Sequence, residues 1–348
     1  MPDAGTIFND RGIDLEVCQC SGCGLVQLSG DPVPYYKDVI RATAFSEEMK
    51  EFRRKQFSEF VQKYSLNGKK VIEIGCGRGE YLSLMRQCGV QTYGLEHLGE
   101  SVAQCIKDGL KVSKGFVESY DHQLDDAPFD AFFILNFLEH LPDPNLTLRG
   151  IYNNLSENAA GLVEVPNFDM ILRNKLFSEF IPDHLFYFTG KTLDTTLEMN
   201  GFEVVDRSEV WHKYILSVIV RKRQKADLSS FYEHQARLKS EIEKYIGSFT
   251  DKKVAIWGAG HQALAVIALT NIADKIRYVV DSAPFKQGKY TPATHLPIVS
   301  PDALKTDPVD AVIVMAASYS DEVAGIIRRR FGKDIKVSIL RDLGLEAA

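Results

Sequence analysis

A glycine-rich turn followed by a spaced acidic residue is the feature of this chain best suited to chemistry. Gly75, Gly77 and Gly79 follow the apolar segment 70–74, and Glu96 ends another such segment about 20 residues later. Glycine lets the chain turn tightly and lets a ligand approach the backbone, while a carboxylate can accept hydrogen bonds from both hydroxyls of a ribose. The spacing therefore predicts a nucleoside or nucleotide site.

Such a site needs a parallel sheet behind it, and the middle of the chain has the corresponding pattern. Helix-length sequence separates the apolar segments that fit strands, which lie at 70–74, 92–96, 110–112, 129–135 and 161–165. A helix is predicted over 46–64, with Ser46 as its N-cap. Segments 202–206 and 214–220 are too close for a helical crossover, so they should pair antiparallel. The pattern favours an α/β fold with a doubly wound sheet.

A second glycine turn lies in the C-terminal region. Gly258 and Gly260 follow an apolar segment, and Asp281 comes about 20 residues later, which fits the dinucleotide-binding pattern. Apolar side chains between the two regions recur at helical spacing and predict an amphipathic helix. We therefore expect a Cys-containing arm (1–45), an α/β domain (46–223), a linking helix (224–250) and a Rossmann-like domain (251–348).

Composition and charge exclude several classes of function. The chain has 41 basic and 47 acidic side chains and a formal net charge of -6, so a large basic surface for nucleic acid is not expected. The N-terminal segment lacks the pattern of a signal peptide, and no uninterrupted apolar stretch is long enough to span a bilayer. The sequence predicts a cytoplasmic protein that binds neither nucleic acid nor membrane.

Three features resemble class I methyltransferases that use S-adenosylmethionine (SAM). Glu73 stands two residues before the first glycine, segment 129–135 runs into Asn136-Phe-Leu-Glu-His-Leu-Pro-Asp143, and an antiparallel pair closes the domain. Within that motif, Glu139 and His140 fit either a catalytic or a capping role. The resemblance implies SAM as cofactor, with Glu73, Gly75, Gly77 and Gly79 at its methionine end, Glu96 at the ribose, Phe116 and Val117 at the adenine, and Asn136 and Phe137 beside the sulfonium.

The order of motifs along nearly the whole chain is similar to that of the SAM-dependent sugar C-methyltransferases of deoxysugar biosynthesis. It combines Cys18-Gln-Cys20-Ser-Gly-Cys23, Val163-Glu-Val-Pro166 and Lys286-Gln-Gly-Lys-Tyr-Thr-Pro292. Members join a zinc-binding N-terminal arm, a methyltransferase core and a C-terminal Rossmann-like domain. The resemblance implies a nucleotide-linked 4-ketosugar as substrate, enclosed between the two large domains.

The arm matches only part of the family's zinc site. That site uses two Cys-x-x-Cys pairs, whereas here only Cys20 and Cys23 match, and a structural zinc needs four ligands. Three outcomes stay open: Cys18 and another group complete a zinc site, the chain lacks part of the arm, or no zinc binds.

The resemblance places catalysis in segment 181–188. His184 matches the family's proposed base and Asp183 replaces its glutamate, while Ile181 stands where the family has a tyrosine. Carbon beside a ketone becomes nucleophilic only as an enolate, which requires a base and a hydrogen-bond donor for the oxyanion. By the resemblance, His184 is the base, and Asp183 holds it.

The remaining candidates are contacts to the substrate or its oxyanion. Tyr187 is assigned to catalysis, and the substrate-binding candidates are Arg41, His212, Gly258, Gly260, His261 and Lys286. Two other functions stay open. An O-methyltransferase acting on a sugar or another small molecule is favoured by the missing tyrosine, and an NAD- or nucleotide-binding protein without methyl transfer is favoured by the second glycine turn.

Overall fold

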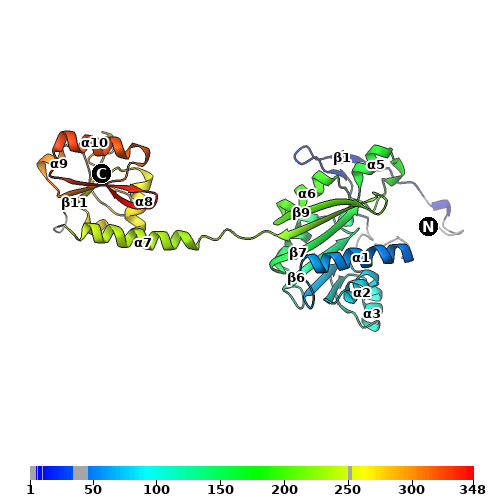
Figure 1. The fold of residues 1–348 in the computed structure, drawn as a ribbon. Helices are drawn as coiled ribbons and strands as arrows, with labels where there is room; N and C mark the ends of the chain where they lie inside the picture. The colour runs from blue at the N-terminus through cyan, green and yellow to red at the C-terminus, as the bar shows by residue number, and fades with distance from the viewer. Residues whose placement is uncertain (1–4, 6, 10, 34–45, 250–252) are drawn as a thin grey trace. The chain divides into compact units, whose positions relative to one another are not determined.

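The computed structural model describes residues 5, 7–9, 11–33, 46–249 and 253–348. The chain divides into two compact units, Met1–Lys225 and Ala226–Ala348, each with its own sheet and core (Figure 1). Across the described ranges, no helix has the length and apolar character that a membrane crossing requires.

A seven-stranded sheet forms the centre of the first unit. Its order is β5-β4-β3-β6-β7-β10-β9, and β10 runs antiparallel to both of its neighbours. The order reverses between β3 and β6, which is where ligands bind in open α/β sheets. The predicted doubly wound sheet and its antiparallel end are confirmed. The strands are β3 (Lys70–Ile74), β4 (Gln91–Glu96), β5 (Lys111–Lys114), β6 (Phe129–Leu135), β7 (Leu155–Pro166), β9 (Phe202–Val210) and β10 (Ile215–Lys222).

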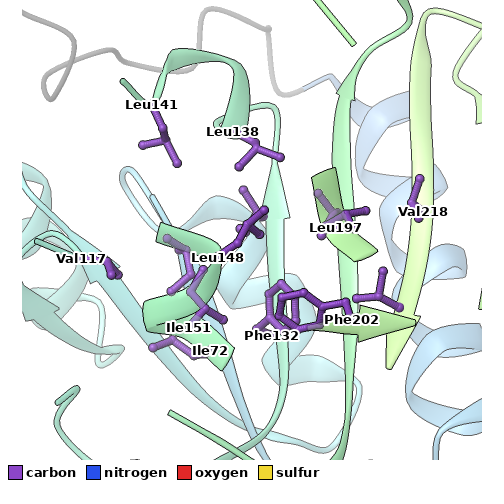
Figure 2. Packing of buried hydrophobic residues seen from close by; sticks show 14 of the residues in the cluster. Ile72, Val117, Phe132, Leu138, Leu141, Leu148, Ile151, Leu197, Phe202 and Val218 are labelled. Carbon is purple, nitrogen blue, oxygen red and sulfur yellow. The ribbon is translucent and has the colours of Figure 1, made fainter. Parts of the chain in front are cut away.

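Helices cover both faces of this sheet because the central strands are apolar on both sides. On β6, Phe132 and Ile134 join one core cluster, while Phe133 and Leu135 join the other. Figure 2 shows the first cluster, in which the rings of Phe132 and Phe202 lie 5.3 Å apart. That face is covered by α4 (Pro144–Asn153) and α6 (Gly190–Met199), and the opposite face by α1 (Glu47–Lys63), α2 (Glu80–Gln87) and α3 (Gly99–Lys107).

The start of α1 follows the sequence prediction. The Oγ atom of Ser46 accepts a hydrogen bond from the backbone N–H of Met49, 3.1 Å away, and Glu47 and Glu48 occupy the first turn. Acidic side chains there interact favourably with the positive end of the helix dipole. Ser46 is therefore the N-cap, as predicted.

A three-stranded antiparallel sheet ties the arm to the segment that carries His184. It consists of β1 (Val17–Gln19), β2 (Val26–Leu28) and β8 (Phe186–Tyr187). β2 pairs directly with β8, and the backbone N–H of Leu28 also donates to the carbonyl of Leu185. The arm thus fixes the backbone just after His184, together with α5 (Phe168–Asn174), whose Phe168 packs against Tyr187.

The second unit is built on a six-stranded sheet of order β13-β12-β11-β14-β15-β16, which is parallel except for β16. Helix α7 (Ser229–Ile246), which lies within the predicted linking segment, places Leu238, Ile242 and Ile246 in the core of this unit. The remaining elements are β11 (Val254–Trp257), α8 (His261–Thr270), β12 (Val279–Val280), β13 (Ile298–Val299), α9 (Ala303–Thr306), β14 (Ala311–Val314), α10 (Ser320–Phe331), β15 (Lys336–Arg341) and β16 (Gly344–Ala347).

The turn between β9 and β10 is strained. Trp211, His212 and Lys213 have φ angles of 47°, 59° and 66°, a left-handed conformation that is unfavourable for residues with a Cβ. We expect Lys213→Gly to raise the free energy of unfolding by about 0.5–1 kcal/mol, because glycine adopts this conformation without steric cost. Urea denaturation would measure the change, with Lys213→Ala as a control that should give no gain. A less stable glycine variant would contradict the prediction.

Candidate active site

A cavity at the carboxyl ends of the strands collects residues that the sequence assigned to the cofactor. It lies where the strand order reverses, and it is lined by Ile74, Gly75, Leu95, Glu96, His97, Gly115, Phe116, Val117, Phe137 and Thr147. Five of the predicted cofactor residues are among them. Glu96, Phe116, Val117 and Phe137, which the resemblance assigns to the ribose, the adenine and the sulfonium, thus line one cavity.

Glu96 and the glycine turn are joined by hydrogen bonds. The backbone N–H of Gly77 donates to Oε2 of Glu96 and that of Leu98 donates to Oε1, both at 2.8 Å. The three turn glycines, Gly75, Gly77 and Gly79, have positive φ angles, and a Cβ added at Gly77 would meet no atom within 4 Å. The turn is thus held in place while leaving open space at its centre for a ligand.

Phe137 lines the cavity on the β6 side, and Asn136 precedes it in the chain. A Cβ added at Gly75 would lie 2.6 Å from the ring of Phe137, so glycine is required for this ring to pack against the turn. Asn136 has a φ of 48°, and its Oδ1 is buried without a hydrogen-bond partner in the described structure. An open glycine turn, a ribose-type carboxylate and an unsatisfied amide oxygen fit SAM, which offers hydroxyl and amino donors. Glu73 lies on β3, two residues before Gly75, and its side chain is fully buried.

Next to this cavity, two histidines from distant parts of the chain lie against each other. His140 follows β6, and its ring centroid is 6.5 Å from that of Phe137. The ring of His184 is 4.7 Å from that of His140 in an edge-to-face arrangement. The carboxylate of Glu139 and the two imidazoles each offer one ligand atom within 4.8 Å of the others. The predicted catalytic histidine thus lies one side chain away from the predicted sulfonium end of the cofactor site.

Both imidazoles are kept uncharged by their surroundings. Burial, reinforced by the neighbouring His140, lowers the pKa of His184 to about 3. Burial also lowers the pKa of His140, although a hydrogen bond between its Nδ1 and the carbonyl oxygen of Asp183, 2.7 Å away, opposes this change. Neutral imidazoles have a lone pair that can accept a proton or bind a metal ion.

Asp183 and Tyr187 contribute mainly to the shape of the loop. The contact of Asp183 at this site runs from its backbone carbonyl to His140, rather than from its carboxylate to His184. The hydroxyl of Tyr187 accepts from the backbone N–H of Ile181 at 3.0 Å and donates to the carbonyl of the same residue at 3.2 Å. These contacts hold the turn that carries His184.

The other predicted substrate contacts lie elsewhere. Arg41 lies outside the described residues. His212 is exposed on the β9–β10 turn, where its Nε2 is 3.8 Å from the carboxylate of Glu48. The second unit holds Gly258 after β11, Gly260 and His261 at the start of α8, and Lys286.

The side chain of Lys286 bonds to residues of the second glycine turn. Its Nζ lies 2.9 Å from Oδ2 of Asp281 and donates to the carbonyl of Ala259 at 3.1 Å. Asp281 also accepts from the backbone N–H groups of Ala283 and Ala259, and these bonds, with that of Lys286, outweigh burial and lower its pKa. The acid of the second turn is therefore engaged with its own loop, as Glu96 is in the first unit.

The arm offers two neighbouring thiols. A hydrogen bond from the backbone of Cys23 is the main cause of a lowered pKa at Cys20. Within the described ranges, the one group of three or more possible metal ligands is Glu139, His140 and His184, so no third ligand joins Cys20 and Cys23. The described part of the arm does not fit a four-ligand zinc site.

Some candidate functional residues escaped assignment from sequence. The motif after β6 contains Glu139 and His140, but no sequence pattern predicts their proximity to His184. Tyr214, at the end of the strained turn, donates to the carboxylate of Glu179 at 2.5 Å. Burial and the negative charges of Glu179 and Glu139 raise the pKa of Tyr214. No local sequence signal marks this tyrosine.

The low pKa of His184 predicts a loss of stability in acid. Between its ordinary value of 6.5 and about 3, the unfolded chain binds a proton that the folded chain does not. The free energy of unfolding should therefore fall with pH, by up to about 2 kcal/mol at about pH 5 from this residue. Urea denaturation at neutral pH and at about pH 5 would measure the decrease in the free energy of unfolding. His184→Gln should remove the part of this decrease that comes from residue 184, whereas His212→Gln, at an exposed site, should leave it unchanged. Equal pH dependence in wild type and His184→Gln would contradict the prediction.

Two methyltransferase families match consecutive parts of the chain. Residues 49–207 match a family described as a methyltransferase domain, and residues 221–334 match one described as a C-methyltransferase C-terminal domain. The C-methyltransferase NovU of Streptomyces niveus is 23% identical over 92% of this chain and 86% of its own length. A ubiquinone biosynthesis O-methyltransferase of Stutzerimonas stutzeri (strain A1501) is 39% identical, but over only 24% of this chain and 39% of that protein.

A SAM-dependent methyltransferase structure from Clostridium acetobutylicum ATCC 824 covers 54% of this chain and 96% of its own, with 11% identity and a TM-score of 0.42. The chain has a class I methyltransferase fold and is a SAM-dependent methyltransferase homologous to NovU, with its two matched domains in consecutive order.

Proposed function

We propose that this SAM-dependent methyltransferase transfers a methyl group to a carbon atom beside the ketone of a nucleotide-linked sugar, through an enolate, in the cytoplasm. The observation that carries the proposal is the contact between His184 and His140 next to the cofactor cavity. The homology to a C-methyltransferase over most of the chain and the C-methyltransferase match of the second unit support methylation at carbon. The nucleotide-linked substrate rests on the family resemblance and on the second Rossmann-like unit.

In this mechanism, His184 accepts the proton that leaves the carbon beside the ketone. The electron pair of the broken C–H bond forms the enolate, and the carbon then bonds to the methyl group as the methyl–sulfur bond breaks. SAM supplies the activated methyl group, and S-adenosylhomocysteine leaves. The carboxylate of Glu139 compensates the positive charge that the imidazole gains.

The residues of the cofactor site have separate roles in this proposal. Glu96 accepts from the ribose hydroxyls, and Phe116 and Val117 contact the adenine. Gly75, Gly77 and Gly79 leave room for the methionine end, and Asn136 and Phe137 border the sulfonium. Tyr187 and Asp183 position the turn that carries His184, as their hydrogen bonds indicate.

The test uses nucleotide-linked 4-ketosugars incubated with the protein and SAM in heavy water, followed by mass spectrometry. We expect deuterium incorporation beside the ketone together with a methyl gain. In His184→Ala, both rates should fall by at least about 100-fold, the usual effect of losing a general base. The variant should still bind S-adenosylhomocysteine, which separates a catalytic defect from a loss of the cofactor site.

Two other results would change the proposal. A methyl gain without solvent exchange would indicate an oxygen acceptor, which the isoleucine at position 181 and the partial match to an O-methyltransferase favour. No reaction with any 4-ketosugar would exclude this substrate class while leaving the methyltransferase assignment unchanged.

A further inference from the structure

The group formed by Glu139, His140 and His184 has the composition of a metal site. It combines one carboxylate and two imidazoles, and their ligand atoms lie within 4.8 Å of one another. Glu139 and His140 are 1% and 6% exposed, so this cluster is not a chance gathering of surface charges. One carboxylate and two histidines form the ligand set of several zinc enzymes, in which a fourth position is left for water or substrate.

The orientation of His140 is the second observation that points to a cation. The Nδ1 atom lies 2.7 Å from the backbone carbonyl oxygen of Asp183, and because a carbonyl only accepts, the ring hydrogen is on Nδ1. The Nε2 atom then carries a lone pair, and it faces Oε1 of Glu139 at 3.9 Å. Histidines that bind metals are usually oriented by such a hydrogen bond from the other ring nitrogen.

Electrostatics favours a cation between these groups. A cation between Nε2 of His140 and Oε1 of Glu139 would interact favourably with the lone pair of one and the negative charge of the other. The ligand atoms of His140 and Glu139 are 3.9 Å apart and all three lie within 4.8 Å of one another, so a central ion fits after a small contraction, since Zn²⁺ ligand bonds measure about 2.0–2.2 Å. Imidazole and carboxylate together favour zinc over magnesium or calcium.

We propose that Glu139, His140 and His184 form a binding site for one zinc-class divalent cation, and that this cation and the substrate proton compete for the lone pair of His184. The second half rests on the proposed function, in which His184 is the proton acceptor. A histidine nitrogen that coordinates a metal cannot accept a proton at the same time. Occupancy of the site therefore inhibits methyl transfer that proceeds through His184.

Cobalt absorption is the first test, because Co²⁺ replaces Zn²⁺ and reports its coordination in the visible range. The parent protein for this test is the full chain with the substitutions Cys18→Ser, Cys20→Ser and Cys23→Ser. These substitutions remove the thiols of the arm, which would compete for the metal. We expect one equivalent of Co²⁺ to bind with the bands of a four-coordinate site. Glu139→Gln and His184→Ala should each weaken binding by at least about tenfold, and His234→Ala, on α7 in the other unit, should not.

Binding of S-adenosylhomocysteine by every variant shows that the first unit is folded. No stoichiometric Co²⁺ binding by the parent protein, or binding that neither Glu139→Gln nor His184→Ala weakens, would overturn the cation site.

Zinc titration of methyl transfer tests the competition. We expect activity to fall in proportion to site occupancy and to return when a chelator removes the metal. Activation by Zn²⁺ would keep the cation site but overturn His184 as proton acceptor. If Co²⁺ binds and no 4-ketosugar reacts even without added metal, the proposed substrate class fails while the cation site stands.

Discussion

Gly77→Arg is expected to abolish binding of S-adenosylhomocysteine, with Kd rising by at least about 100-fold. Gly77 has a φ of 56°, and an added Cβ would meet no atom within 4 Å. The Cβ of an arginine therefore displaces no protein atom, at a backbone cost of about 1–2 kcal/mol, and we expect the rest of the side chain to extend into the open centre of the turn. It then fills the space that the methionine end of the cofactor requires. Isothermal titration calorimetry would measure the change in Kd.

A matched control exists in the second glycine turn. Gly260 also has open space around its Cβ position, whereas a Cβ at Gly258 would lie 2.4 Å from the carbonyl oxygen of Met315. Gly260→Arg is therefore the suitable control, because Gly258→Arg would disturb the packing of its own unit. We expect Gly260→Arg to leave S-adenosylhomocysteine binding unchanged. Tight binding by Gly77→Arg, or its loss in Gly260→Arg, would place the cofactor elsewhere.

The cofactor site could be predicted from sequence because its parts follow strand ends. In a parallel sheet, the carboxyl ends of neighbouring strands meet at one edge, so residues after β3, β4, β5 and β6 come together once the strand order is known. Glu96 ends β4, Phe116 and Phe137 lie two residues after β5 and β6, and all three line the cavity. Spacing indicated Glu96, whereas Phe116 and Phe137 were implied by the resemblance to class I methyltransferases.

The candidate catalytic site could be predicted only in part, because it depends on how distant loops pack. The bond between His140 and Asp183 joins residues 43 positions apart, and neither has a local pattern that predicts the other. The arm pairs with β8 through a strand of two residues, too short to be recognised by alternation of apolar side chains. The left-handed turn at Trp211 contains no glycine that would mark it. In each case, tertiary packing sets the conformation.

Glu164→Leu is expected to destabilise the first unit by about 3–5 kcal/mol. Glu164 on β7 and Arg53 on α1 form an ion pair of 2.5 Å in which both side chains are fully buried. Gln56 also donates to the carboxylate of Glu164, at 2.5 Å. Removing the carboxylate leaves the guanidinium of Arg53 buried without a counterion. The backbone carbonyl of Glu164 also accepts a hydrogen bond from the N–H of Asn136 at the cofactor site. Urea denaturation would measure the loss of stability.

The double variant Arg53→Met/Glu164→Leu separates the attraction within the pair from the cost of leaving one charge alone. Desolvation offsets much of the attraction in a buried pair, so two apolar side chains of similar size should restore most of the lost stability. We expect the double variant to be at least about 2 kcal/mol more stable than Glu164→Leu. The guanidinium of Arg53 also lies 4.9 Å from the ring centroid of Tyr81, a contact that methionine keeps in apolar form. If the double variant instead loses as much stability as the two single variants together, the buried lone charge is not the cause of the loss, because the double variant contains no charge at either position.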